Sequence, residues 1–123
     1  MPFLAQIAIT VIAVSHIGFM ILEMFLWDKP IGTRIFGTEI AFAKRSKNLA
    51  ANQGLYNGFL AAGLIWSLMP IGAPDATKAI ATFFLTCVLS AGIFGARTVS
   101  IKILWVQALP ALITLCLVWL LAV

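Results

Sequence analysis

Four stretches, each long and apolar enough to cross a lipid bilayer, dominate the sequence. A hydrocarbon core about 30 Å thick needs about 20 mostly apolar residues in an α-helix. The four runs cover residues 3–27, 49–69, 79–96 and 103–123, and Glu23 is the one acidic or basic residue among them. The runs are apolar all round, whereas barrel strands alternate polar and apolar residues. The sequence therefore predicts an all-α polytopic membrane protein, a single domain (1–123) built as a four-transmembrane-helix bundle.

The composition excludes several classes of soluble protein. The 123 residues are 63% hydrophobic and 10% charged, whereas an average soluble domain is about 45–50% apolar and about 25% charged. A small soluble domain has too little interior to bury so much apolar side chain. The net charge is +4, but the basic residues occupy short loops, so we expect no nucleic-acid partner.

The first run also has to be distinguished from a secretory signal peptide. It lacks a basic N-terminal region, contains His16 and Glu23, and is about twice the length of a typical signal-peptide apolar region. We therefore expect it to be retained as a permanent span.

Basic residues are distributed unevenly among the predicted loops. Loop 28–48 carries five and loop 97–102 carries two, whereas loop 70–78 carries one. Because cationic loops stay in the cytoplasm, the sequence predicts a multi-pass protein of the cytoplasmic (inner) membrane with loops 28–48 and 97–102 inside and both termini outside. Loop 28–48 also interleaves apolar and basic residues, which fits either a short helix in the headgroup region or a solvated loop. In both cases we expect membrane lipid as a partner.

Polar side chains gather in the half of each span nearest the predicted cytoplasmic side. They are Glu23, Asn52, Gln53, Tyr56, Asn57, Ser90, Arg97 and Gln107. His16 lies two helical turns from Glu23 on the same face, and Trp27 continues that stripe to the interface, where its indole N–H would meet headgroups. Intramembrane polar groups are costly and often mark function. The pattern predicts a polar pocket, open to the cytoplasm, that binds a small amphipathic ligand.

Three functions remain open for this pocket. In an enzyme, Glu23 and His16 would be the catalytic acid and base, and the amide side chains would orient the substrate. In a proton-coupled transporter, Glu23 would carry the proton, although the outer halves of the spans offer few polar side chains for a route. In a structural or lipid-interacting subunit, the polar stripes would only hold helices together, as Thr82, Thr86 and Ser90 do in ordinary helix packing.

No cofactor and no metal are predicted. Cys87 and Cys116 fall inside different spans and have no neighbouring thiol or histidine at metal-site spacing. Nucleotide-binding and zinc-protease motifs are missing from the sequence.

Small residues recur at intervals of four in two of the predicted spans. They are Ala50, Gly54, Gly58 and Ala62 in the second, and Ala91 and Gly95 in the third. Such ridges let helix backbones approach closely. We expect them to pack helix against helix, with a homo-oligomer contact as the alternative.

Four runs of sequence resemble the DUF1304 family of small integral membrane proteins. They are HIGFMILEMFLW at 16–27, LAANQGLYNGFLAAGL at 49–64, GIFGARTV at 92–99 and VQALPAL at 106–112. The resemblance spans nearly the whole chain and implies a fold of four transmembrane helices. It implies no established activity, so no catalytic residue is carried over from it. Looser likenesses to small multidrug exporters, to membrane glutathione and eicosanoid enzymes and to sterol isomerases rest on size or fold alone.

Overall fold

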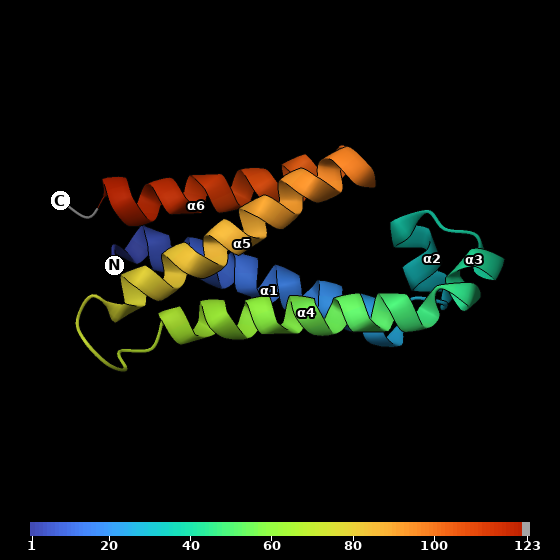
Figure 1. Cartoon of the computed structure of the whole chain (residues 1–123), viewed down its shortest axis with the longest axis horizontal. Helices are drawn as coiled ribbons and strands as arrows, with labels where there is room; N and C mark the ends of the chain where they lie inside the picture. The colour runs from blue at the N-terminus through green and yellow to red at the C-terminus, as the bar shows by residue number, and fades with distance from the viewer. Residues whose placement is uncertain (122–123) are drawn as a thin grey trace. The chain divides into compact units, whose positions relative to one another are not determined.

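The computed structural model describes residues 1–121 of the chain, which form helices and connecting loops without a strand. The last two residues of the predicted span 103–123 lie outside this range. The helices, in chain order, are α1 (Phe3–Phe25), α2 (Pro30–Phe36), α3 (Ile40–Arg45), α4 (Lys47–Ser67), α5 (Ala76–Thr98), the π-helix η1 (Leu104–Ala108) and α6 (Leu109–Leu120) (Figure 1). The all-α prediction is confirmed for this part of the chain.

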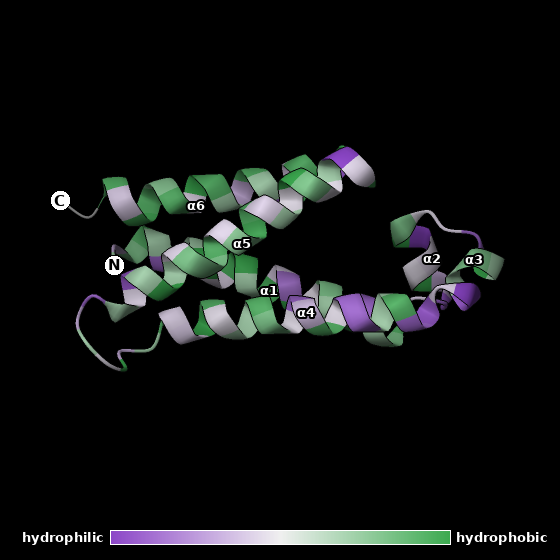
Figure 2. Ribbon diagram, viewed as in Figure 1, coloured by the Kyte–Doolittle hydropathy of each residue, from purple (hydrophilic) through white to green (hydrophobic). Residues whose placement is uncertain are grey.

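Each predicted span corresponds to a helix or a helix pair. Two of them, α1 and α5, are long and apolar enough to cross a membrane, whereas the continuous segment Leu104–Leu120 is apolar but shorter. Helix α4 has the length of a span, and polar residues in its first half lower its hydropathy. Figure 2 shows this contrast, because the first half of α4 is largely hydrophilic and α6 is almost entirely hydrophobic.

Contacts divide the chain into two compact units. The first unit combines Met1–Ala13 with the chain from Leu60 onward, and the second unit is Val14–Phe59. Helices α1 and α4 each contribute one part to the first unit and the other part to the second.

The core of the first unit is aliphatic. Ile9 of α1, Leu64 of α4, Leu85 and Val88 of α5 and Val118 of α6 are completely buried and belong to one cluster. Helices α5 and α6 run side by side in this unit (Figure 1). Burial of apolar surface away from water, or close packing within lipid, stabilises this arrangement.

Helix α5 approaches η1 closely at Gly92. A Cβ on Gly92 would lie 2.8 Å from the backbone nitrogen of Ala108 and 2.9 Å from its Cα. The ridge predicted on this helix used Ala91 and Gly95. Gly95 does face a neighbour, since its Cβ would lie 3.2 Å from Ile103, but Ala91 is exposed. Gly92 is the residue that lets the backbones meet.

A proline explains the π-helical turn before α6. Pro110 has no N–H to continue the i→i−4 ladder, and its ring crowds the carbonyl four residues earlier. The backbone widens there, and the N–H of Leu109 bonds to the carbonyl of Leu104, five residues back. The hydroxyl of Thr114 donates to the carbonyl of Pro110 at 2.8 Å.

In the second unit, α4 packs on α1 through two glycines of the predicted ridge. A Cβ on Gly54 would lie 2.7 Å from the Met24 side chain and 3.1 Å from the Met20 carbonyl oxygen, and a Cβ on Gly58 would lie 2.7 Å from the Met20 sulfur. The predicted helix–helix packing is confirmed at these two positions.

Loop 28–48 forms two short helices. Pro30 occupies the first turn of α2, and Gly37 ends that helix in the left-handed conformation (φ 67°) that favours glycine. Gly32 presses directly on the Leu26 carbonyl, where no Cβ fits.

Trp27 anchors this loop. Its indole nitrogen donates to the Ser46 hydroxyl at 3.0 Å, and its ring lies 4.9 Å from that of Phe36. The expectation that this N–H meets lipid headgroups is therefore wrong, because Ser46 accepts its hydrogen bond. An ion pair between Lys47 and Asp28 (3.6 Å) adds a second link between the ends of the loop.

Candidate functional site

The strongest polar cluster in the second unit is built on the Glu23 carboxylate of α1. The Asn57 amide nitrogen of α4 donates a hydrogen bond to it, and the Gln53 side chain lies close enough to favour its charged form. Gln53 and Asn57 are four residues apart and therefore share a face of α4. The sequence predicted that Glu23, Gln53 and Asn57 all belong to the site, and the fold brings these three together.

Glu23 is buried, with 4% of its surface exposed. The side chains that act on this carboxylate are the Asn57 and Gln53 amides, not a cation. A buried charge without a cation is costly unless hydrogen bonds compensate it. The amides of α4 therefore offset the cost of burying the Glu23 carboxylate in an otherwise apolar helix.

His16, the other predicted catalytic residue, is even more deeply buried (1% exposed). Its ring meets Phe19 edge-on at 5.3 Å between centroids. Seven residues of helix separate His16 from Glu23, which is about 10 Å along the axis. At that separation the two side chains act on a common substrate only if the substrate spans two turns of α1.

Three of the predicted ligand-binding residues of α4 are exposed at the surface of the protein. They are Asn52, Gln53 and Tyr56, and Tyr56 is 60% exposed, with its ring edge-on to Phe59 at 5.7 Å between centroids. Hydrogen-bonding side chains of this kind are costly where they face acyl chains.

Ser90, Arg97 and Gln107 belong to the first unit. Ser90 and Arg97 are exposed on α5. Gln107 is half-buried in η1, and its amide nitrogen donates to the Val88 carbonyl of α5 at 3.1 Å. A glutamine placed beside Pro110 thus links two helices.

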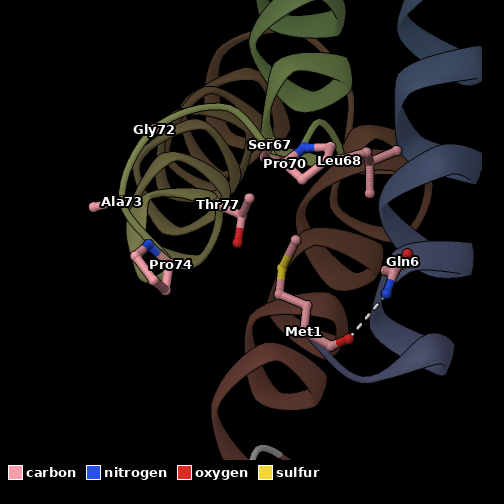
Figure 3. A pocket seen from close by; sticks show the side chains of 9 residues that line it. All are labelled: Met1, Gln6, Ser67, Leu68, Pro70, Gly72, Ala73, Pro74 and Thr77. Carbon is pink, nitrogen blue, oxygen red and sulfur yellow. Dashed lines mark hydrogen bonds between the residues drawn. The ribbon is translucent and has the colours of Figure 1, made fainter.

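A cavity of about 420 Å³ lies in the first unit, beside the loop between α4 and α5 (Figure 3). Its lining contains no charged side chain. The Gln6 amide in it already donates to the Met1 carbonyl at 2.9 Å, and the Ser67 hydroxyl donates to the Leu64 carbonyl at 2.6 Å. The lining residues are Met1, Gln6, Ser67, Leu68, Pro70, Gly72, Ala73, Pro74 and Thr77. None of them was predicted as a site residue.

Sequence reasoning also missed a polar contact between the start of α5 and the end of α6. The Trp119 indole nitrogen donates to the Thr82 hydroxyl at 3.0 Å, and the Lys78 ammonium lies 3.9 Å from the Trp119 ring centroid. Thr82 itself donates to the Lys78 carbonyl, and Thr86 donates to the Thr82 carbonyl, each at 2.7 Å. The signals in the sequence were a lysine near the start of one apolar run and a tryptophan near the end of another.

Comparison with known proteins gives the family. A family model described as "Protein of unknown function (DUF1304)" matches residues 10–119, nearly the whole chain. The chain belongs to the DUF1304 family. No curated protein and no solved structure matches it.

The DUF1304 match includes parts of both compact units. It also includes Glu23, Gln53 and Asn57, which together are called the carboxyl–amide cluster. Across the described part of this DUF1304 chain, no group of three His, Cys, Asp or Glu side chains converges in the way a metal ion requires. The cluster itself offers one carboxyl group and two amides, and the Tyr56 phenol is exposed on the same helix.

Proposed function

We propose that the protein is an integral membrane protein with four spans, and that it binds a small amphipathic molecule at the polar face of α4. The exposed Gln53 and Tyr56 side chains contact the polar group of the ligand. Glu23 is the positioning residue, because its carboxylate accepts the hydrogen bond of Asn57 and attracts the Gln53 amide on the same face of α4. The observation that carries the proposal is the Glu23 carboxylate, which is buried and bonded by amides beside an exposed polar surface.

The membrane placement is supported by where the apolar side chains lie. Only 28% of the residues in the most apolar window of α1 and 22% of those in α5 are buried within the protein. Large apolar side chains such as Val14, Phe25 and Phe94 are more than half exposed. Contiguous apolar surface of this extent needs a lipid environment.

Helix α4 is the second span in this proposal. Its 21 residues rise about 31 Å at about 1.5 Å each, which matches a hydrocarbon core about 30 Å thick. Its polar residues lower its hydropathy, and they are the same residues that form the candidate site. A span that carries such residues is stable when they bind one another or a ligand. The segment Leu104–Leu120, extended by the residues that flank it, is the fourth span.

The chemistry of the exposed face indicates the class of ligand. An amide and a phenol both donate and accept hydrogen bonds, so they suit a hydroxyl, amine or amide group at the end of an apolar tail. The exposed apolar side chains beside them, Leu55 and Phe59, supply the surface for that tail.

Photo-crosslinking in nanodiscs tests the proposal. The probe is a long-chain amine with a diazirine in its tail, and the crosslinked peptide is identified by mass spectrometry. We expect labelling of the 52–59 segment, reduced about tenfold by Gln53→Leu, since one hydrogen bond to an exposed ligand is worth about 1 kcal/mol or slightly more.

The matched control is Gln6→Leu, because Gln6 is also an exposed glutamine on an apolar helix but lies in the other unit. It should leave labelling of the 52–59 segment unchanged. Equal labelling of Gln53→Leu and the unmodified protein would show that α4 contacts lipid without a specific polar site.

A further inference from the structure

A groove of about 600 Å³ lies in the first unit, between the start of α5 and the end of α6. Asp75, Lys78, Thr82 and Phe83 line it from the α5 side, and Trp119 lines it from α6. Pockets of about 300–1,000 Å³ are the size that small-molecule ligands occupy. The groove has no part in the site around Glu23, whose residues belong to the second unit.

Hydrogen bonds fix one wall of the groove. The Trp119 indole nitrogen donates to Thr82, and the Thr82 hydroxyl donates to the Lys78 carbonyl one turn earlier. The Lys78 ammonium lies over the Trp119 ring at 3.9 Å, a cation–π contact that places the cation at the groove. The lysine is therefore held at the groove by its own neighbours.

The two charged side chains of the groove, Asp75 and Lys78, do not pair with each other. Asp75 stands at the N-cap of α5, but its carboxylate makes no capping hydrogen bond. Within the described residues, Asp75 and Lys78 form no ion pair with each other. The groove thus presents one anionic and one cationic group, three positions apart on the same helix.

Beside these charges the walls are apolar and exposed. Phe83 is 63% exposed and Trp119 is 53% exposed. Tryptophan at the end of a membrane helix typically lies at the level of the headgroups. The start of α5 therefore combines charged groups with exposed aromatic side chains. This combination suits a lipid, whose head is charged and whose chains are apolar.

We infer that this groove binds the head of a zwitterionic phospholipid that carries a primary ammonium group. The phosphate lies at Lys78, the ammonium donates to the Asp75 carboxylate, and an acyl chain runs along Phe83 and Trp119. A primary ammonium has N–H donors for Asp75 and a quaternary ammonium has none, so the site prefers phosphatidylethanolamine to phosphatidylcholine. The inference rests on the proposed placement in a membrane.

The test is lipid retention measured by native mass spectrometry. The full chain is reconstituted in nanodiscs of equimolar phosphatidylethanolamine, phosphatidylcholine and phosphatidylglycerol, and the lipids that remain bound after release are counted. The unmodified protein should retain several-fold more phosphatidylethanolamine than either other lipid. Lys78→Gln should lower retention of all three, since each carries a phosphate, whereas Asp75→Asn should abolish the preference over phosphatidylcholine.

Lys102→Gln is the matched control, because Lys102 is an exposed cation beyond the other end of α5. It should leave both retention and preference unchanged. Melting of each variant in the same nanodiscs checks that α5 and α6 still pack.

Equal retention of the three lipids by the unmodified protein would overturn the inference, and so would a preference for phosphatidylglycerol that Asp75→Asn leaves unaltered. A chain that does not enter the nanodisc at all would overturn the membrane placement, so the two failures are distinguishable.

Discussion

Asn57 donates a hydrogen bond from its amide nitrogen to a carboxylate oxygen of Glu23, 34 positions earlier in the chain, at 2.5 Å. The bond joins α4 to α1 inside the second unit, and the Gln53 side chain lies beside the same carboxylate. The partners are amides, which satisfy the carboxylate without cancelling its charge.

Removing the amide should destabilise the second unit. Asn57→Leu leaves the buried Glu23 carboxylate with one hydrogen bond fewer, and interhelical hydrogen bonds of this kind contribute about 0.6–1.7 kcal/mol in membrane proteins. We expect the apparent Tm in detergent to fall by a few degrees. Asn48→Leu is the control, because Asn48 is exposed in the first turn of α4, and its Tm should stay within error of the unmodified protein.

Glu23→Gln should separate the structural role of the carboxyl group from its charge. Glutamine has the same shape and keeps an oxygen that accepts from Asn57, so we expect Tm to fall by less than it does in Asn57→Leu. Crosslinking of the amine probe at 52–59 should nevertheless drop, because the cluster then has no carboxylate to position Gln53. If both crosslinking and Tm were unchanged, the Glu23 carboxylate would neither stabilise the contact of α1 with α4 nor position Gln53.

The contact of α4 with α1 also depends on Gly54. A methyl group there meets Met24 at 2.7 Å, the Glu23 Cβ at 3.0 Å and the Met20 carbonyl oxygen at 3.1 Å. Gly54→Ala should therefore cost about 1–3 kcal/mol through overpacking and lower Tm.

The control is Gly18→Ala on α1, where nothing lies within 4 Å of the added Cβ. An alanine is favoured over glycine in a helix interior by about 0.8–1 kcal/mol, so this variant should keep or raise Tm. Thermal melts of the two variants in the same detergent should therefore differ in sign.

The helices were predictable because the apolar runs are long and the charges lie between them. The first and last residues of each helix were not predictable, because they depend on local contacts. The predicted run 79–96 began directly after the charged Lys78, whereas α5 starts at Ala76, directly after the loop residues Pro74 and Asp75. A charged residue such as Lys78 can lie inside a helix when its ammonium has a partner, as it does here over the Trp119 ring.

The members of the carboxyl–amide cluster were predictable, but their pairing was not. Polarity at membrane depth singled out Glu23, Gln53 and Asn57 individually. Which of them meet depends on the register between α1 and α4, and that register follows from how Gly54 and Gly58 lie against Met20 and Met24. A spacing of four residues shows that a helix can approach a neighbour closely, but it does not show which neighbour or at what height.

The same limit explains Gly92. Spacing pointed to Ala91 and Gly95, but a Cβ on Gly92 would lie within 3.0 Å of three atoms of Ala108, two of them backbone atoms. Backbone atoms cannot rotate away as a side chain does. Gly92→Ala should therefore lower Tm by several degrees, for a cost of about 1–3 kcal/mol.

Gly95→Ala is the comparison for Gly92→Ala. Its added methyl would meet Ile103 side-chain atoms at 3.2 Å, and this side chain can adjust by a few tenths of an ångström. We expect a clearly smaller loss of Tm than in Gly92→Ala. Equal losses in the two variants would mean that the approach of α5 to η1 is looser than the structure has it.

The proposed orientation follows from the basic loops and can be measured directly. In a background with Cys87→Ala and Cys116→Ala, a single cysteine is introduced by Glu39→Cys or by Ala73→Cys, both at exposed loop positions. Because five cations occupy 28–48, we expect that loop in the cytoplasm. A membrane-impermeant maleimide should then label Ala73→Cys in intact cells and Glu39→Cys only after lysis. Labelling of Glu39→Cys alone in intact cells would invert the orientation, and equal labelling of both would indicate dual topology. An inverted orientation would place the exposed face of Gln53 and Tyr56 nearest the side opposite to the one that its neighbouring charges predict, and dual topology would place it near both sides.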